Sequence, residues 1–333
     1  MNIDAVVLWV DGNDPAWQKE KAEYQGKKID DSNSVNRYRD WGLMPYWFRA
    51  VEKFLPWIRK IHFVTWGHIP EFLNTQSPKI NIVKHSDFIP EKYLPTFSSH
   101  TIEANIHRIK DLSEHFIYFN DDMFVLRSMS ENAFFKDGLP CTCACERPIE
   151  LNGTLEAWQY AAVNDLAIVN AHFNKKEQMK KYRKKYINSA YRWQDNLRTL
   201  AVETMFPDYF TGFKNLHAPA AYLKSTFEDV WSAELGILDK TSLNKFRKGE
   251  DVNQWVMLWW QIASGNFSPY DTDNVVLSVG DGNIDYITNL ITSQSNDMVC
   301  INDPDGDVDF ETLSRKLKDA FEKILPEKSE FEK

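Results

Sequence analysis

The sequence lacks any hydrophobic run long enough to cross a membrane. None of its 333 residues falls in a stretch that approaches the roughly 18 to 20 uninterrupted apolar residues of a membrane-spanning helix. The first residues, Met1 to Asp4, also lack the basic region and apolar core that open a secretory signal. We therefore expect a cytoplasmic protein.

Positive charge is scarce in the chain as a whole. The sequence has 39 lysine and arginine residues against 48 aspartate and glutamate residues, a formal net charge of -9 at pH 7. Binding to a nucleic-acid backbone depends on broad attraction between basic side chains and phosphates. The charge balance therefore predicts that nucleic acid is not a partner.

Cysteine is rare too, and three of the four cysteines form the closely spaced set Cys141, Cys143 and Cys145. This alternating spacing predicts that all three lie on one face of a strand. In the cytoplasm we favour packed, reduced thiols. A zinc site is the alternative, although no second ligand pair at metal-site spacing follows in the sequence.

The residues that are abundant predict an α/β protein. Hydrophobic residues make up 43% of the chain and aromatic residues 14%, which suffices for a large core. Four short apolar runs early in the chain have the length of strands: residues 3–10, 61–66, 80–84 and 115–119. Helical patterns separate these runs, for example between Trp41 and Trp57. Such alternation is typical of a parallel sheet.

The later chain predicts fewer strands. Ser98 and Ser99, followed by Glu103, predict a capped helix before the fourth run. Further on, residues 196–261 have mainly helical patterns, and glycine, asparagine, aspartate and serine then punctuate a stretch that we expect to be rich in loops. We find no repeat or long linker and expect one domain: an α/β part at 1–150, a mainly helical part at 151–265, and a loop-rich return with a C-terminal helix at 266–333.

A run of basic residues interrupts this pattern between Lys175 and Lys185. A solvated helix face explains it most simply. The alternative is a local basic patch that meets an anionic or lipid-linked glycan acceptor at the inner membrane surface.

Carboxylates follow two of the predicted strands. In a parallel sheet, ligands gather at the carboxyl ends of the strands. The first run leads into Trp9, Asp11 and Gly12, where the indole could stack on a base, although Asp-Gly turns are common. The fourth run ends in Asn120-Asp121-Asp122, where two adjacent carboxylates suit a divalent cation on a diphosphate.

Two further residues outside the predicted sheet attract attention. His217 stands two positions before the rigid Pro219, although an isolated histidine is more often a packed or surface residue. Arg247 lies close to Glu250 and Asp251, and its guanidinium matches the geometry of phosphate oxygens.

These segments together resemble the four conserved blocks of the Stealth family of hexose-1-phosphate transferases, which includes bacterial capsular polysaccharide phosphotransferases and the animal GlcNAc-1-phosphotransferase. The matching segments are residues 3–15; residues 36–41 continuing through 94–105 to 120–124; His217-Ala218-Pro219 with Arg247, Glu250 and Asp251; and Cys300-Ile301-Asn302-Asp303. Ala220 and Lys224 depart from the animal enzyme, which has histidine and arginine there, and this leaves donor and acceptor preference open.

The resemblance implies active-site roles for Asp122, His217, Arg247 and Asp303. It also implies a nucleotide-sugar-binding sheet of mostly parallel strands, similar to GT-A or Rossmann-like folds, with a largely helical C-terminal portion completing the site. We expect these residues at the donor: Trp9, Asp11, Gly12, Arg37, Arg39, Asp40, Asn120 and Asp121. Arg37, Arg39 and Asp40 would bind the donor diphosphate or brace their loop by ion pairing.

The expected reaction transfers a hexose 1-phosphate, for example N-acetylhexosamine 1-phosphate, from a UDP-sugar to a glycan hydroxyl and releases UMP. We expect His217 or a carboxylate to take the hydroxyl proton, Arg247 to hold the phosphate, and Asp122 with Asp303 to bind Mg²⁺ or Mn²⁺. A conventional glycosyltransferase that releases UDP is the alternative. A third interpretation is a non-catalytic glycan-binding protein that uses some of the 12 tryptophans as sugar platforms.

Overall fold

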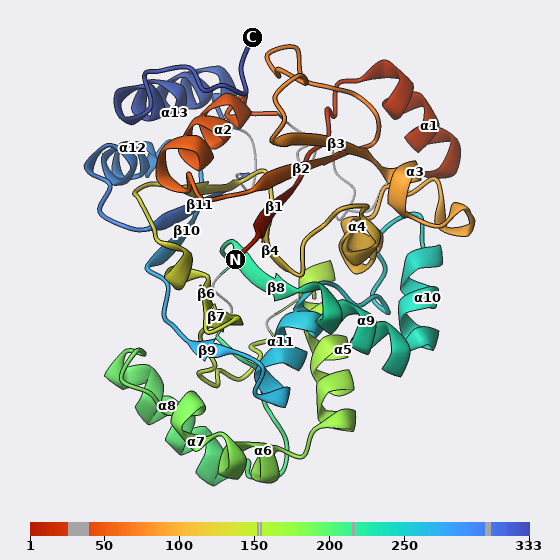
Figure 1. Ribbon diagram of the computed structural model, residues 1–333, viewed down its shortest axis with the longest axis vertical. Coiled ribbons are helices and arrows are strands. Elements are labelled where there is room, and N and C mark those ends of the chain that lie inside the picture. The colour runs from red at the N-terminus through yellow and green to blue at the C-terminus, as the bar shows by residue number, and fades with distance from the viewer. Residues whose placement is uncertain (26–39, 152, 154, 215–216, 304–307) are drawn as a thin grey trace.

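A five-stranded sheet lies at the centre of the computed structural model (Figure 1), which describes residues 1–25, 40–151, 153, 155–214, 217–303 and 308–333. The strands run in the order β3-β2-β1-β4-β8. Their bounds are β1 (Ile3–Leu8), β2 (Lys60–Thr65), β3 (Ile80–Lys84), β4 (His115–Phe119) and β8 (Ala220–Leu223). The first four are mutually parallel and β8 is antiparallel to β4. The predicted mostly parallel α/β sheet is confirmed, with the first strand ending at Leu8.

Burial explains why these runs are almost continuously apolar. Helices and loops cover both faces of the sheet, so residues from Ile3 to Val7 are all fully buried. Asp4 is the one charged residue in this buried segment. Its carboxylate accepts hydrogen bonds from Arg59 and from the backbone N–H of Ser113, and it contacts His62. A buried charge is tolerated there because it is paired and hydrogen-bonded.

Four helices accompany the parallel strands: α1 (Pro15–Gln25), α2 (Met44–Phe54), the short α3 (His85–Phe88) and α4 (Ser99–Asn105). The helix predicted between Trp41 and Trp57 is α2. The helix predicted after Ser98 is α4, but the Ser98 side chain makes no capping hydrogen bond. Glu103 instead lies inside the protein, where it contacts the Tyr118 hydroxyl and accepts from the backbone N–H of Gln254. The capping mechanism that we predicted is therefore wrong.

A group of helices extends from the sheet toward the bottom of Figure 1. These are α5 (Ala157–His172), α6 (Lys175–Lys181), α7 (Arg183–Tyr186) and α8 (Trp193–Met205). After β8 follow α9 (Lys224–Ala233), α10 (Leu235–Leu243) and α11 (Trp255–Ser264). None of the described helices combines the length and apolar character that a membrane crossing requires.

The stretch expected to be rich in loops contains a strand-helix-strand unit. Its elements are β10 (Asn274–Ser278), α12 (Ile284–Ser293) and β11 (Met298–Asn302), and α13 (Phe310–Ile324) follows as the predicted C-terminal helix. β10 is parallel to β11, which pairs antiparallel with β5 (Met123–Val125). The prediction of loops fails because Gly280 to Asn283 form only the turn that joins β10 to α12.

A third small sheet has the order β6-β7-β9, with β6 (Phe135–Lys136), β7 (Leu139–Thr142) and β9 (Ser268–Pro269). Because β7 ends at Thr142, Cys141 lies in this strand but Cys143 and Cys145 do not, and the expectation that these three cysteines share one strand face is wrong. Cys143 and Cys145 are buried in a separate apolar cluster, and all four cysteines are free thiols.

Candidate active site

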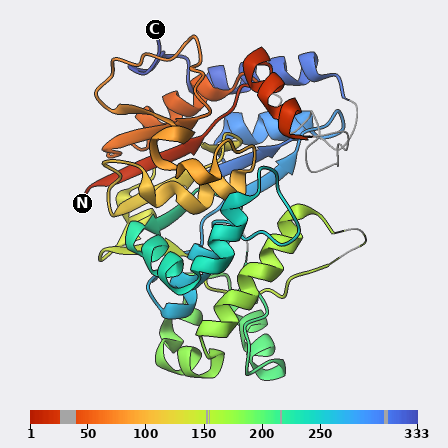
Figure 2. The same ribbon diagram turned by 90° about the vertical axis from the view of Figure 1, so that its right-hand side faces the viewer.

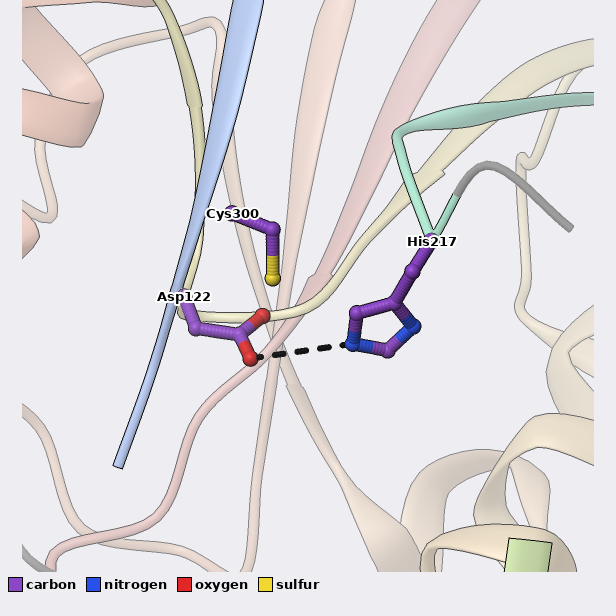
Figure 3. A group of neighbouring side chains, drawn as sticks. All are labelled: Asp122, His217 and Cys300. Atoms are coloured by element: carbon purple, nitrogen blue, oxygen red, sulfur yellow. Dashed lines mark ion pairs between the residues drawn. The ribbon is translucent and has the colours of Figure 1, made fainter. Parts of the chain in front are cut away.

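The candidate site is centred on Asp122, in the turn between β4 and β5 (Figure 3). One carboxylate oxygen of Asp122 lies 3.9 Å from Nε2 of His217. The sulfur of Cys300 joins this pair, and the three side-chain atoms all lie within 4.8 Å of one another. His217 precedes β8 and Cys300 belongs to β11, so three distant segments of the chain meet here.

Strand pairing holds this group together. Cys300 of β11 lies opposite Met123 of β5. The N–H of Ile301 donates to the backbone carbonyl of Asp122 at 2.9 Å. At the end of β11, Oδ1 of Asp303 accepts from the indole N–H of Trp41 at 2.6 Å. β11 and the residue that follows it therefore bring both Cys300 and Asp303 to the carboxyl end of β4.

Negative charges crowd around Asp121. Burial, together with the negative charges of Asp122, Asp40 and Asp303, raises the pKa of Asp121 to about 8. The Asp121 side chain is nevertheless exposed to solvent, so water screens part of these interactions. Burial also raises the pKa of Asp122, while the neighbouring His217 opposes that rise. Four predicted site residues thus share one electrostatic environment that favours positive charge.

The loop after β1 contains Asp11 and Gly12 and is held in place by His68. Nε2 of His68 accepts from the backbone N–H of Asp11 at 2.8 Å, and Nδ1 lies 3.6 Å from Asp14. Burial lowers the pKa of His68 despite these aspartates, which suits an acceptor nitrogen. Our sequence reasoning missed His68, although it follows β2 at the same edge of the sheet, where the rule about strand ends applies.

Trp9 lies in the hydrophobic core rather than on an open surface. Its side chain is 8% exposed and packs against Phe63, with ring centroids 5.6 Å apart, and edge-on against His68 at 5.1 Å. This burial argues against the expected stacking of a base on Trp9. The indole instead supports the loop that follows β1.

Asn120 is fixed by a chain of polar contacts from the interior. Its side-chain oxygen accepts from the hydroxyl of Tyr118 at 2.5 Å. That hydroxyl also lies 3.3 Å from Glu103 of α4. Because Tyr118 and Glu103 are buried, Asn120 has little freedom to turn away from the site.

Arg247 lies next to α4. Its guanidinium donates to the hydroxyl of Ser99 at 2.7 Å. Asp251 anchors this loop, because it accepts from the backbone N–H of Lys248 and lies 3.4 Å from Nδ1 of His100. Within the described residues, the polar contact of Arg247 is with Ser99 and not with Asp122. The structure therefore does not bring Arg247 into direct contact with the Asp122 group.

Two of the donor-site predictions, Arg37 and Arg39, lie outside the described residues. Asp40 is described, and its carboxylate accepts from the backbone N–H of Gly42 at 2.6 Å. Gly42 has a φ of 67°, a conformation that glycine adopts readily. Asp40 thus shapes the turn that contains Trp41, besides adding negative charge near Asp121.

Comparison with known proteins identifies the class. Residues 1–29 match Stealth protein CR1, conserved region 1, and residues 37–141 match Stealth protein CR2, conserved region 2. The chain is 40% identical over 339 aligned positions to a capsular polysaccharide phosphotransferase WcwK of Streptococcus pneumoniae, covering 100% of this chain and 99% of the relative.

Other relatives extend this similarity. The exopolysaccharide phosphotransferase cps2G of Lactiplantibacillus plantarum (strain ATCC BAA-793 / NCIMB 8826 / WCFS1) is 36% identical, covering 100% of this chain and 96% of the relative. The receptor polysaccharide phosphotransferase WefC of Streptococcus gordonii is 38% identical, covering 99% of this chain and 98% of the relative. The chain is thus an enzyme that transfers phosphate-containing groups. It belongs to the Stealth family, as the sequence motifs predicted.

Proposed function

We propose that this enzyme transfers a hexose 1-phosphate, for example N-acetylhexosamine 1-phosphate, from a UDP-sugar to a hydroxyl of a glycan acceptor and releases UMP. The observation that carries the proposal is the Asp122–His217 pair within a cluster of carboxylates at the carboxyl end of β4. The relatives, which are named as phosphotransferases of capsular and other polysaccharides, support a role in the synthesis of a cell-surface polysaccharide. We place this reaction in the cytoplasm.

In the proposed reaction, the acceptor oxygen attacks the phosphorus that carries the sugar. A new P–O bond forms, the bond from that phosphorus to the bridging oxygen breaks, and UMP leaves with the bridging oxygen. The product is a phosphodiester between the hexose and the acceptor. The acceptor proton passes to His217.

The orientation of His217 supports its role as the base. Nε2 faces Asp122 across 3.9 Å, and the second ring nitrogen points away from Asp122 (Figure 3). Asp122 would orient the ring and stabilise the imidazolium that forms, as the aspartate does in other histidine–aspartate pairs. The separation exceeds a hydrogen bond, and we expect it to shorten when substrate binds, as catalytic contacts commonly do.

The carboxylates suit a divalent cation. Oδ1 of Asp122 is buried, and the polar neighbour of this carboxylate on β11 is the thiol of Cys300, a weak donor. Such a carboxylate gains from a positive partner. We propose that Asp122 and Asp303 hold Mg²⁺ or Mn²⁺, which both prefer oxygen ligands. When bound, the cation would neutralise charge on the donor phosphates. Because both cations prefer oxygen to sulfur, we do not assign the Cys300 thiol as a ligand.

Arg247 and the loop after β1 complete the proposed donor site. The Arg247 guanidinium would hold a phosphate of the donor, because its planar N–H groups match two phosphate oxygens and keep their charge at all working pH values. Asp11 and Gly12, braced by His68, would line the other side of the donor. Asn120, fixed through Tyr118, would keep the Asp121–Asp122 turn in place.

A product assay tests the proposal. A panel of UDP-sugars is incubated with oligosaccharide acceptors and Mg²⁺ or Mn²⁺, and mass spectrometry separates UMP from UDP. We expect UMP release that depends on acceptor, with phosphate retained in the glycan. Release of UDP would instead identify a conventional glycosyltransferase and would remove the proposed roles of His217 and Arg247.

A further inference from the structure

A basic lobe stands apart from the acidic character of the chain. We define it as residues 174–206, which include α6, α7 and α8. The lobe has nine basic and three acidic residues, whereas the chain as a whole has a net charge of -9. It lies at the bottom of the molecule in both Figure 1 and Figure 2, away from the central sheet.

Several of these basic side chains have structural partners. Lys175 is fully buried and pairs with Glu146 at 2.7 Å. Lys185 donates to the backbone carbonyls of Gly265 and Phe267. The arginines pair with carboxylates: Arg183 with Glu203, Arg192 with Asp271 and Asp273, and Arg198 with Asp195. These contacts build the lobe and leave other charges to be explained.

Four lysines of the lobe are exposed and lack such partners. They are Lys176, Lys180, Lys181 and Lys184. Within the part of the chain that the structure describes, none of their ammonium groups lies within 4.0 Å of a carboxylate, the distance that defines an ion pair. Lys181 does lie over the ring of Tyr182. Four lysines without an ion pair at this distance thus gather within nine consecutive positions of an acidic protein, a stretch whose one acidic residue is Glu177.

Large apolar side chains are exposed on the same lobe. Trp193 is 68% exposed and Leu197 54% exposed, and their spacing of four residues puts them on one face of α8. Met205 and Phe206, at the end of this helix, are 63% and 52% exposed. The opposite face of α8 packs inward through Val202. The helix therefore turns apolar residues toward solvent, where they gain nothing from burial.

The lysines and the apolar residues belong to adjoining helices. Arg183 of α7 pairs with Glu203 of α8. Lys175, at the start of α6, donates to the carbonyl of Phe206 at 2.7 Å. The exposed lysines of α6 and α7 and the exposed apolar residues of α8 thus belong to one lobe, a combination typical of surfaces that rest in the interface of an anionic bilayer.

We propose that the basic lobe binds the surface of a membrane that contains anionic lipids. The ammonium groups of Lys176, Lys180, Lys181 and Lys184 lie against lipid phosphates, and Trp193 with Leu197 enters the headgroup region. A second copy of the chain fits this surface less well, because a symmetric contact would bring the same lysines of both copies together. The proposal concerns where the enzyme resides and does not depend on which nucleotide the reaction releases.

Vesicle sedimentation with the full chain tests the proposal. Vesicles of phosphatidylcholine alone are compared with vesicles of phosphatidylcholine and phosphatidylglycerol. We expect binding to the anionic vesicles only, weakened by added salt. Replacing all four lysines, K176Q/K180Q/K181Q/K184Q, should weaken binding by roughly 10²-fold or more, because each lysine near an anionic surface contributes about fivefold.

Two further variants sharpen this test. W193S/L197S should weaken vesicle binding without changing its dependence on salt. The matched control K19Q/K110Q/K136Q/K323Q removes four exposed lysines from other parts of the chain and should bind like the original protein. Circular dichroism melting checks that every variant is folded.

Three results would overturn the proposal. They are no binding to anionic vesicles, equal binding to both kinds of vesicle, and equal losses in the lobe variant and the control. Analytical ultracentrifugation adds a fourth: if the chain forms a dimer that W193S/L197S dissociates while vesicles are not bound, a second copy covers the lobe.

Discussion

The carboxyl end of β4, with Asp121 and Asp122, and the basic lobe differ in how their charged side chains are surrounded. At this edge of the sheet, Asp121 and the half-buried Asp122 lie close to other carboxylates, and their pKa values rise. On the lobe, lysines such as Lys180 remain in water. Crowded and partly buried charges lower the stability of the fold and persist where the chemistry needs them. Exposed charges cost little stability, and each contributes only a small part of the binding free energy. Single substitutions should therefore have large effects at the edge and small effects on the lobe.

The largest expected effect comes from removing the proposed phosphate ligand. Arg247→Ala should abolish transfer while leaving the fold intact, because the guanidinium contacts only the Ser99 hydroxyl within the described structure. Initial rates of UMP release and a melting curve measure both expectations. Arg147→Ala, which removes an exposed arginine, is the control. Turnover at the original rate in Arg247→Ala would rule out the proposed role.

The next effect is the loss of the proposed base. His217→Ala should reduce kcat by about 10² to 10⁴-fold, the usual contribution of general base catalysis. Added imidazole should restore part of the rate, a response that a purely structural histidine would not give. His172→Ala, at a histidine on α5 that pairs with Glu234, should retain full activity. A smaller loss without rescue would place the base elsewhere.

Two lysines on α6, one buried and one exposed, allow a direct comparison of how much each charge contributes to stability. Lys175→Met leaves the buried carboxylate of Glu146 without its partner and should lower the free energy of unfolding by about 3 to 5 kcal/mol. Lys180→Met, at an exposed position of the same helix, should change it by less than about 0.5 kcal/mol. Urea unfolding measures both values. Similar values for the two variants would contradict the distinction.

The smallest effect concerns Asp121 and depends on pH. Folding raises the pKa of Asp121 to about 8, above that of an aspartate in the unfolded chain. Its contribution therefore favours the folded state at low pH and is lost as the pH rises through about 8. Asp121→Asn should melt at the same temperature as the original protein near pH 4 and about 2 °C or more higher above pH 8.

Two comparisons check the cause of this pH effect. Asp281→Asn, at an exposed loop position, should not change the melting temperature at either pH. Added Mn²⁺ should raise the melting temperature of the original protein at high pH and raise that of Asp121→Asn less. An equal response to Mn²⁺ in both proteins would mean that the cation does not bind near this carboxylate.

Local patterns predicted the parallel part of the fold well. The four parallel strands and α2 follow from apolar runs and helical spacing, because each run must bury its own side chains. The rule that ligands gather at strand ends also led to Asp11, Asp121 and Asp122. His68 follows from the same rule, and it was missed because a single histidine after a strand has no distinctive neighbours.

The features that the sequence did not predict depend on pairing between strands that are far apart in the chain. β11 lies beside β5, although well over a hundred residues separate them, and no local pattern encodes that register. This pairing brings Cys300 to Asp122, and the prediction of loops in this region overlooked it. Trp9 shows the opposite case, since an aromatic residue in a promising loop packs into the core. Only the packed structure distinguishes an open ring from a buried one.

The pairing of β11 with the Asp122 turn also has a consequence during synthesis on the ribosome. Asp122 is translated well over a hundred residues before β11, the strand whose Ile301 N–H bonds to the Asp122 carbonyl. The proposed metal ligand Asp303 follows immediately after that strand. If Asp303 binds the cation as proposed, a nascent chain that already contains the whole central sheet should have no transferase activity, and a ribosome that stalls before β11 should release no active fragment.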